Sequence, residues 1–374
     1  MSLPSSSKPL NDRLQKGVEM EPFVQQPKWK VPEYSRSKII NAGKTFRKPD
    51  ATEDELAEAT KVIDNWRASH AFPLHVIYMH LRRMRGSNPD VIVAERLKRL
   101  DSITSKLKRE SQMNLWTMQD LGGCRVIVPT IHSVYKFASD YENSRKRHIK
   151  KREYDYIKNP KESGYRSLHV VYEYHSDRND AYNKNMLIEI QYRTHLQHLW
   201  ATAVETMGLF TKEAIKSGQG SASVRRFFVL ASALFSIIEK QPIVPNVPSD
   251  IDAILSEIGI LEKQKNYLAF LSGIRVAIDN QDQKAAMHKS GYCILILNYN
   301  TRRLSLKYFN ASQIDAANAT YNSIERTQGK MKIDAVLVRV SSFKELRSAY
   351  PNYFSDIQEF IEIISGYLNR HGFA

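Results

Sequence analysis

The hydrophobic pattern changes character along the chain, from helical spacing to short strand-like runs. Apolar residues first recur every three to four positions in three segments: residues 50–70, 73–86 and 88–110. Short apolar strands then alternate with helices, with strands at 124–129, 169–175 and 186–194 and helices at 131–144, 196–210 and 223–241. This order predicts an α/β (α+β) fold: a mixed β-sheet flanked by helices.

Three prolines within residues 242–250 interrupt this pattern and predict a linker. A helical stretch over residues 250–278 follows. Beyond it, a β-β-α-β-α order predicts a compact α+β module, with elements at 292–300, 303–309, 312–327, 332–342 and 355–371. We therefore expect a main domain with a basic N-terminal extension, a linker with helices, and a small α+β domain, with the boundaries 1–240, 241–290 and 291–374.

The chain is basic, with 55 Lys and Arg against 40 Asp and Glu, a net charge of +15. This excess favours a polyanionic partner such as nucleic acid, a nucleotide or a membrane surface. No apolar run reaches the ~18 residues of a membrane span, and the N-terminus lacks a secretory signal, so we expect a cytoplasmic protein. The two cysteines, Cys124 and Cys293, lie in separate apolar runs, which predicts buried reduced thiols rather than a zinc site.

Polar side chains gather on one face of the strand predicted at residues 186–194. Glu189, Gln191 and Arg193 alternate with apolar residues, so they form either a solvated outer face or the polar floor of a site. Asp120 stands before two glycines and a buried strand. An acid there is either a turn residue or a Mg²⁺ ligand, and pairing with Glu189 favours the metal.

Two further segments concentrate charge. Residues 96–109 are rich in cations, which form either a solvated helix face or a phosphate site. The stretch NPKESGYRSLH, residues 159–169, places Lys161, Tyr165 and His169 beside a predicted strand. A turn requires the Pro and the Gly but not the Tyr and the cationic side chains, which indicates that this loop binds something.

Four motifs in order, RLKRLDSITSKL, DLGGCRVIV, NPKESGYRSLH and IEIQYRTHLQHLWA, resemble the RelA/SpoT synthetase domain over roughly residues 35–240. That family transfers pyrophosphate from ATP to a ribose 3′-hydroxyl. The resemblance implies an ATP site formed by Arg96, Lys98, Lys106 and Arg125. It implies catalysis and Mg²⁺ binding by Asp120 and Glu189, and acceptor binding by Lys161, Tyr165, His169, Gln191 and Arg193.

The resemblance leaves the acceptor open. A toxic group within the family modifies the 3′ CCA end of tRNA, whereas small alarmone synthetases make (p)ppGpp or an adenosine analogue; a degenerate RNA-binding module is a third alternative. The lead-in at residues 33–47, the basic charge and Ser163 in the acceptor loop favour tRNA. The candidate tRNA-binding cations, which are solvated loop residues in the simpler interpretation, are Arg82, Arg83, Arg85, Arg145, Lys146, Arg147, Lys150, Lys151 and Arg152.

The C-terminal part resembles, more weakly, the fused toxin–antitoxin proteins called CapRel. That resemblance implies autoinhibition by a Tyr-x-x-Tyr plug, here Tyr350 and Tyr353, and a phage structural protein as the activator. Without it, these tyrosines read as packing residues around a Pro-Asn turn. No His-Asp dipeptide occurs in the chain, so we do not expect the hydrolase activity of the long family members.

Overall fold

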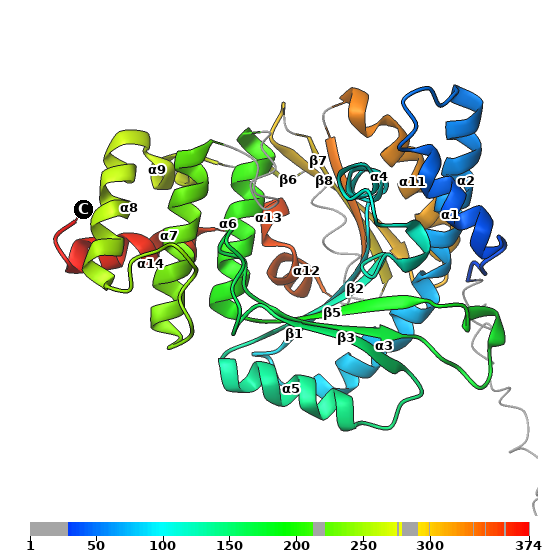
Figure 1. Ribbon diagram of the computed structural model, residues 1–374, viewed down its shortest axis with the longest axis horizontal. Helices are drawn as coiled ribbons and strands as arrows, with labels where there is room; N and C mark the ends of the chain where they lie inside the picture. The colour runs from blue at the N-terminus through cyan, green and yellow to red at the C-terminus, as the bar shows by residue number, and fades with distance from the viewer. Residues whose placement is uncertain are drawn as a thin grey trace, which may run out of the picture.

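The computed structural model describes residues 29–211, 221–274, 277–278, 291–298, 300–331, 333–340, 342–354 and 357–373. Within them, nine strands form one sheet in the order β3-β4-β5-β2-β1-β9-β7-β8-β6. Helices cover this sheet on both faces (Figure 1). The predicted fold class, a mixed sheet flanked by helices, is confirmed.

Three N-terminal helices precede the sheet: α1 (Arg36–Thr45), α2 (Glu53–Ser69) and α3 (Ala71–Arg85). Thr52 begins α2 with a capping box, because its side chain accepts from the Glu55 backbone while Glu55 accepts from the Thr52 backbone. The helix buries Trp66, which stacks on Trp116. Helices α1 and α2 share a core with Ile103 and Leu107 of α4, while α3 packs on β1 and β2.

Five strands form the first half of the sheet: β1 (Ile92–Leu97), β2 (Gly122–Val128), β3 (Ile149–Asp155), β4 (Leu168–Glu173) and β5 (Leu187–Thr194). Two helices join them, α4 (Leu100–Arg109) and α5 (Ile131–Asn143), and α6 (His195–Thr211) follows. Short 3₁₀ turns occur at η1 (Leu115–Thr117) and η2 (Asp180–Tyr182).

Two sequence predictions for this half are wrong. The segment 88–110 is not helical throughout, because its aliphatic start forms β1, which pairs along its whole length with β2, and only its end forms α4. The basic run at 145–152 is not simply a loop, because its second half begins β3. This strand lies at the sheet edge, where exposed charged side chains are usual, so it lacks the apolar alternation that would reveal it.

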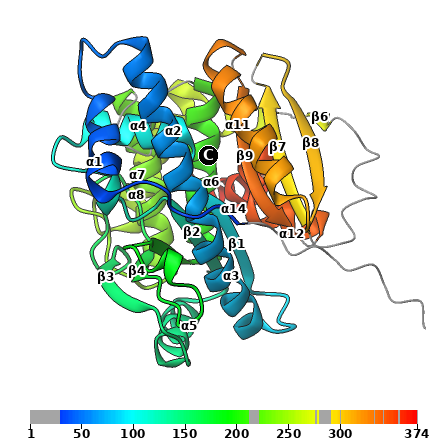
Figure 2. The same cartoon turned by 90° about the vertical axis from the view of Figure 1, so that its right-hand side faces the viewer.

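The second half of the sheet comprises β6 (Ala277–Ile278), β7 (Gly291–Asn298), β8 (Arg303–Asn310) and β9 (Ile333–Val340). Helix α11 (Ile314–Met331) covers one face, beside β7 and β9 (Figure 2). Residues 343–354 form two short helices on the other face: α12 (Phe343–Ala349), which Ser342 caps, and α13 (Pro351–Phe354). The Pro-Asn pair that the simpler interpretation takes as a turn thus begins the single-turn helix α13.

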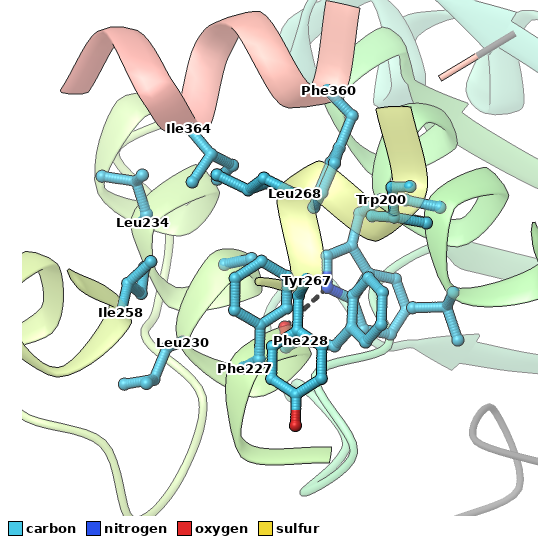
Figure 3. Close-up of a cluster of buried hydrophobic side chains, with 14 of the residues drawn as sticks. Trp200, Phe227, Phe228, Leu230, Leu234, Ile258, Tyr267, Leu268, Phe360 and Ile364 are labelled. Carbon is cyan, nitrogen blue, oxygen red and sulfur yellow. Dashed lines mark hydrogen bonds between the residues drawn. The ribbon is translucent and has the colours of Figure 1, made fainter. Parts of the chain in front are cut away.

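A separate helical cluster lies beside the sheet, formed by α6, α7 (Ala222–Ile238), α8 (Ile251–Lys265), α9 (Tyr267–Gly273) and the final helix α14 (Gln358–Arg370). Phe360 of α14 packs against Phe228 of α7 (Figure 3), and its ring also contacts Phe235 of the same helix. The chain therefore returns from its C-terminal module to the helices that follow β5. The boundaries expected at residues 240 and 290 stay predictions.

The described residues bear on the expected membrane spans and on the two cysteines. None of their helices has both the length and the apolarity that crossing a bilayer requires. Cys124 and Cys293 are buried free thiols, as predicted.

Candidate active site

The strand register assembles the polar floor of a site from three strands. On β5, Gln191 lies opposite His169 of β4 and also opposite Arg125 of β2. Two residues earlier on β5, Glu189 lies opposite Gly123 of β2, and Gly123 lies opposite Arg96 of β1. Side chains at paired positions share one face of a sheet, so these residues project to the same side.

A cavity of about 1610 Å³ covers this floor. It exceeds the 300–1,000 Å³ of an ordinary ligand pocket and has room for two nucleotides. Nearly all predicted ATP, metal and acceptor residues line it: Arg96, Lys98, Lys106, Asp120, Arg125, Lys161, Tyr165, His169, Glu189 and Gln191. Arg193 is instead buried beneath the wall, where it donates to the Tyr165 hydroxyl and to Gln191 Oε1, each at 2.7 Å.

One end of the cavity is cationic around a single carboxylate. Lys98 Nζ lies 2.8 Å from Asp120 Oδ2, and Lys106 Nζ lies 3.2 Å from Asp120 Oδ1. Burial would raise the pKa of Asp120, but the two ammonium groups outweigh it and lower that pKa to about 2. Asp120 is therefore ionised, and it holds two cations that could move to the phosphates of a nucleotide.

A hydrogen-bonded chain occupies the floor around Glu189. His169 Nδ1 lies 3.1 Å from Glu189 Oε2, and Gln191 donates to Glu189 Oε1 at 2.6 Å. The Tyr165 hydroxyl lies 2.7 Å from His169 Nε2. Burial opposes both charges, yet the pairing lowers the pKa of Glu189 and raises that of His169. Glu189 is thus held as a carboxylate, the form that a general base requires.

Two carboxylates in this cavity fit the needs of Mg²⁺, which takes one or two protein carboxylates and completes its shell with water and substrate phosphates. Asp120 and Glu189 are close enough for the charge of Asp120 to raise the pKa of Glu189. In the described part of the chain, no cluster of three or more His, Cys, Asp or Glu side chains forms a closed metal cage. The donor set is consistent with an ion that arrives with its nucleotide.

The acceptor loop is supported by residues that the sequence did not single out. Arg166 makes a buried ion pair with Glu239 at 3.0 Å, and Glu239 also accepts from Thr194. Ser232 donates to the carbonyl of Gly164 at 2.6 Å, where the backbone has a φ of +86°. No local signal marks Glu239, because its partners lie on other elements. Helix α7 thereby fixes the loop that carries Lys161 and Tyr165.

The C-terminal helices α12 and α13 reach into the same cavity. Figure 1 shows them between α6 and the sheet. The Tyr350 hydroxyl donates to the carbonyl of Glu95 at 2.7 Å, and Arg125 Nη1 donates to the carbonyl of Ala349 at 3.4 Å. Burial, followed by the charge of Arg193, lowers the pKa of Arg125 to about 10. A residue predicted to bind ATP is therefore covered by the C-terminal segment.

Tyr353 anchors the second end of this segment. Its hydroxyl donates to Asp334 Oδ2 at 2.6 Å, and Asp334 forms an ion pair with Arg99 at the start of α4. Both Tyr350 and Tyr353 are buried and line the cavity. The structure therefore brings the two predicted plug residues to the predicted nucleotide site, while their effect on activity stays a prediction.

The cations predicted to bind tRNA have mixed surroundings, and their role stays a prediction. Three pair with acids on the surface: Arg147 with Asp177, Lys150 with Glu142 and Glu153, and Lys151 with Glu173. In α3, Arg85 pairs with Glu345 of α12 at 2.7 Å. Of the nine candidates, Arg152 lines the cavity. Beside it stand two aromatic residues that the sequence analysis missed, Tyr154 and Tyr156.

The part of the chain that carries these residues is similar to known proteins. Residues 95–212 match the model of the region found in RelA / SpoT proteins. The chain is 34% identical over 117 residues to the GTP pyrophosphokinase YjbM of Bacillus subtilis, covering 31% of this chain and 54% of the relative. It is 30% identical over 132 residues to the GTP pyrophosphokinase YwaC of the same organism, covering 34% and 62%. The chain thus spans less than two thirds of each relative.

Among solved structures, small alarmone synthetase 1 of Bacillus subtilis bound to its product pppGpp is 25% identical, with a TM-score of 0.39, covering 46% of this chain and 89% of that one. Small alarmone synthetase 2 of the same organism is 22% identical, with a TM-score of 0.39, covering 47% and 93%. The matched region carries Arg96, Lys98, Asp120, Tyr165 and Glu189. The match to the region found in RelA / SpoT proteins thus covers residues 95–212 of a longer chain.

Proposed function

We propose that this protein is a pyrophosphokinase that transfers the β,γ-pyrophosphate of ATP to a ribose 3′-hydroxyl. The observation that carries the proposal is the register of β1, β2, β4 and β5, which gathers the RelA/SpoT motif residues in one cavity. The 3′-oxygen attacks the β-phosphorus, the bond from the β-phosphorus to the α,β-bridging oxygen breaks, and AMP leaves. Such a reaction depends mainly on positioning and on charge stabilisation.

Each residue has a role that follows from its place. Glu189 takes the proton of the 3′-hydroxyl, and its carboxylate is held ready by His169 and Gln191. Lys98 and Lys106 leave Asp120 to neutralise the phosphates. Asp120 and Glu189 would hold Mg²⁺, which supplies further neutralisation of the polyphosphate when it is bound.

The acceptor that we favour is the 3′ CCA end of tRNA, whose modification would inhibit translation. The net charge of +15 suits a polyphosphate backbone, because each phosphate neutralised by Lys or Arg adds to affinity. A second candidate is alarmone synthesis, favoured by the relatives named GTP pyrophosphokinases. Both candidates use the same chemistry and differ in what the acceptor cavity admits.

We further propose that the C-terminal segment inhibits the enzyme until a protein trigger displaces it. Supporting this, the segment covers Arg125 and is tied to Glu95, next to Arg96. By resemblance, the trigger is a phage structural protein and the protein serves phage defence. Truncation is a poor test of inhibition, because α14 would be lost from the helical cluster that packs beneath the acceptor loop.

The test uses ATP labelled on its γ-phosphate, offered with GDP, GTP or deacylated tRNA. The full chain is compared with the same chain carrying Tyr350→Ala and Tyr353→Ala, and with Tyr350→Phe, which removes the hydrogen bond but keeps the ring. We expect label on tRNA from the double variant, less from Tyr350→Phe and least from the parent. Label on GDP or GTP alone would favour the alarmone function. An inactive double variant with every acceptor would contradict the proposed activity.

A further inference from the structure

The cavity floor continues beyond the motif residues onto the edge strand β3. Tyr154 lies opposite His169 of β4, and Arg152 lies opposite Val171, which is itself opposite Glu189. Arg152 and Tyr154 therefore share the face of His169 and Gln191, while Glu153, which lies opposite Val170, projects to the other side. Both Arg152 and Tyr154 line the cavity, together with Tyr156.

The aromatic residues form a line that leads outward from the acceptor loop. The rings of Tyr154 and Tyr156 are parallel within 2° and 5.9 Å apart, and Tyr156 meets the Tyr165 ring edge-on. Tyr165 is only 6% exposed and its hydroxyl is engaged by His169. Tyr154 and Tyr156 are partly exposed. The accessible aromatic surface therefore lies on β3, one position beyond the acceptor site.

Arg152 differs from its neighbours on the same strand. Lys150 and Lys151 are held by acidic side chains on the surface of the molecule. Arg152 is exposed, and no acidic partner is found for it among the described residues. A cation beside an aromatic platform is the combination that binds single-stranded nucleic acid, with the rings stacking on bases and the cation binding phosphate.

We propose that Tyr154 and Arg152 form a subsite for the nucleotide that precedes the reacting one at the 3′ end of a single-stranded RNA. Tyr154 stacks on the base of that nucleotide, and Arg152 contacts the phosphate that joins it to the terminal residue. The inference rests on the proposed function and specifies its substrate as a polynucleotide, because a mononucleotide has no second base to place on Tyr154.

The first test measures binding without ATP, in the full chain carrying Tyr350→Ala and Tyr353→Ala. The probes are a short single-stranded RNA ending in CCA, with a 5′ fluorophore read by anisotropy, and GDP, read by calorimetry. We expect Tyr154→Ala to weaken RNA binding about 5- to 100-fold, as loss of one stacked base implies, and to leave GDP binding within about twofold. Tyr154→Phe keeps the ring and should keep the affinity, which separates stacking from the hydrogen bond to Gln119.

One matched control uses the opposite face of the same strand, where Glu153→Ala should leave RNA binding unchanged. Arg152→Gln should weaken RNA binding and reduce the slope of log affinity against log salt by about 0.7. The matched cation control is Lys136→Gln on α5, an exposed lysine that pairs with Asp140, and it should do neither. Equal losses for RNA and GDP in Tyr154→Ala, or no loss for either, would overturn the subsite.

Failure of this inference can be told apart from failure of the proposed function. If the open chain labels GDP but does not bind the RNA, the subsite is wrong and the pyrophosphokinase activity stands. If the chain labels no acceptor while Tyr154→Ala still weakens RNA binding selectively, the subsite stands and the proposed activity is wrong.

Discussion

The two halves of the nine-stranded sheet each have continuous strand pairing, but little strand pairing joins them. They meet between β1 and β9, a boundary that we call the seam. Within the first half, β1 pairs with β2 along its full length, from Ile92 to Leu97. Within the second, β7 pairs with β9 from Gly291 to Asn298. Across the seam, the described pairing of β1 with β9 is limited to Arg96 and Val338. Side chains rather than backbone hydrogen bonds must therefore hold the halves together.

The side chains at the seam include a buried ion pair. Arg67 of α2 bonds to Glu325 of α11, and both side chains are 3% exposed. Glu325 also accepts from the backbone of Leu100 at 3.0 Å, at the start of α4, and from the Tyr321 hydroxyl at 2.8 Å. A C-terminal residue thereby supports the helix that carries Lys106. The seam therefore depends on a few side chains, whereas each half is held by continuous strand pairing.

The largest expected effect is on chemistry within the first half. In the chain carrying Tyr350→Ala and Tyr353→Ala, Glu189→Gln should lower transfer of label from ATP by about 10³-fold or more, because the base is lost. The control is Glu173→Gln, which changes an acid of β4 that pairs with Lys151 outside the cavity. Comparable rates in Glu189→Gln and the control would remove Glu189 from the mechanism.

The next effect concerns the seam itself. Glu325→Gln should destabilise the closed chain by about 3 kcal/mol, because it removes the nearer of the two carboxylates, Glu325 and Asp64, that pair with the buried Arg67. We expect a lower Tm and higher transfer activity from the otherwise unchanged full chain. Glu257→Gln is the matched control, because Glu257 pairs with Arg226 at a more exposed position and should cost below about 1 kcal/mol. A lower Tm with activity still absent would mean that the seam does not control the site.

A buried pair within one half should behave differently from the pair at the seam. Glu239→Gln removes the charged partner of Arg166 behind the acceptor loop and should destabilise the chain by about 2–3 kcal/mol. In the open double-tyrosine variant, KM for the acceptor should rise about tenfold while KM for ATP stays unchanged. Glu257→Gln, on α8 where it pairs with Arg226 of α7, again serves as control. Equal increases in both KM values would contradict a role confined to the acceptor loop.

The smallest effect is a gain in stability at the seam. Burial raises the pKa of Glu95 to about 8, from an ordinary 4.5, despite Arg339 and Arg82 nearby. The folded chain holds this proton where the unfolded chain releases it, so stability falls as pH rises from about 4.5 to 8. At pH 7, Glu95→Gln should therefore raise the free energy of unfolding by roughly 1–2 kcal/mol and increase the Tm. Near pH 4, the substitution should change neither quantity. A gain independent of pH would contradict this origin.

The sequence was sufficient for the elements whose pattern is local. Alternation in β5 predicted that Glu189, Gln191 and Arg193 share a face, and the resemblance of four motifs to the RelA/SpoT domain implied most of the residues that line the cavity. The same local signals failed for β1, whose aliphatic residues continue into a helical pattern, and for β3, whose charges conceal an edge strand.

The sequence by itself determined the class of fold, the order of the motifs and the charge that favours an anionic partner, because periodicity and composition are local properties of a chain. Only the tertiary structure decided that Tyr154 and Arg152 continue the site floor, that Glu239 supports the acceptor loop and that Tyr350 lies against β1. Each of these contacts joins residues on different elements, and sheet register and helix packing set their distance.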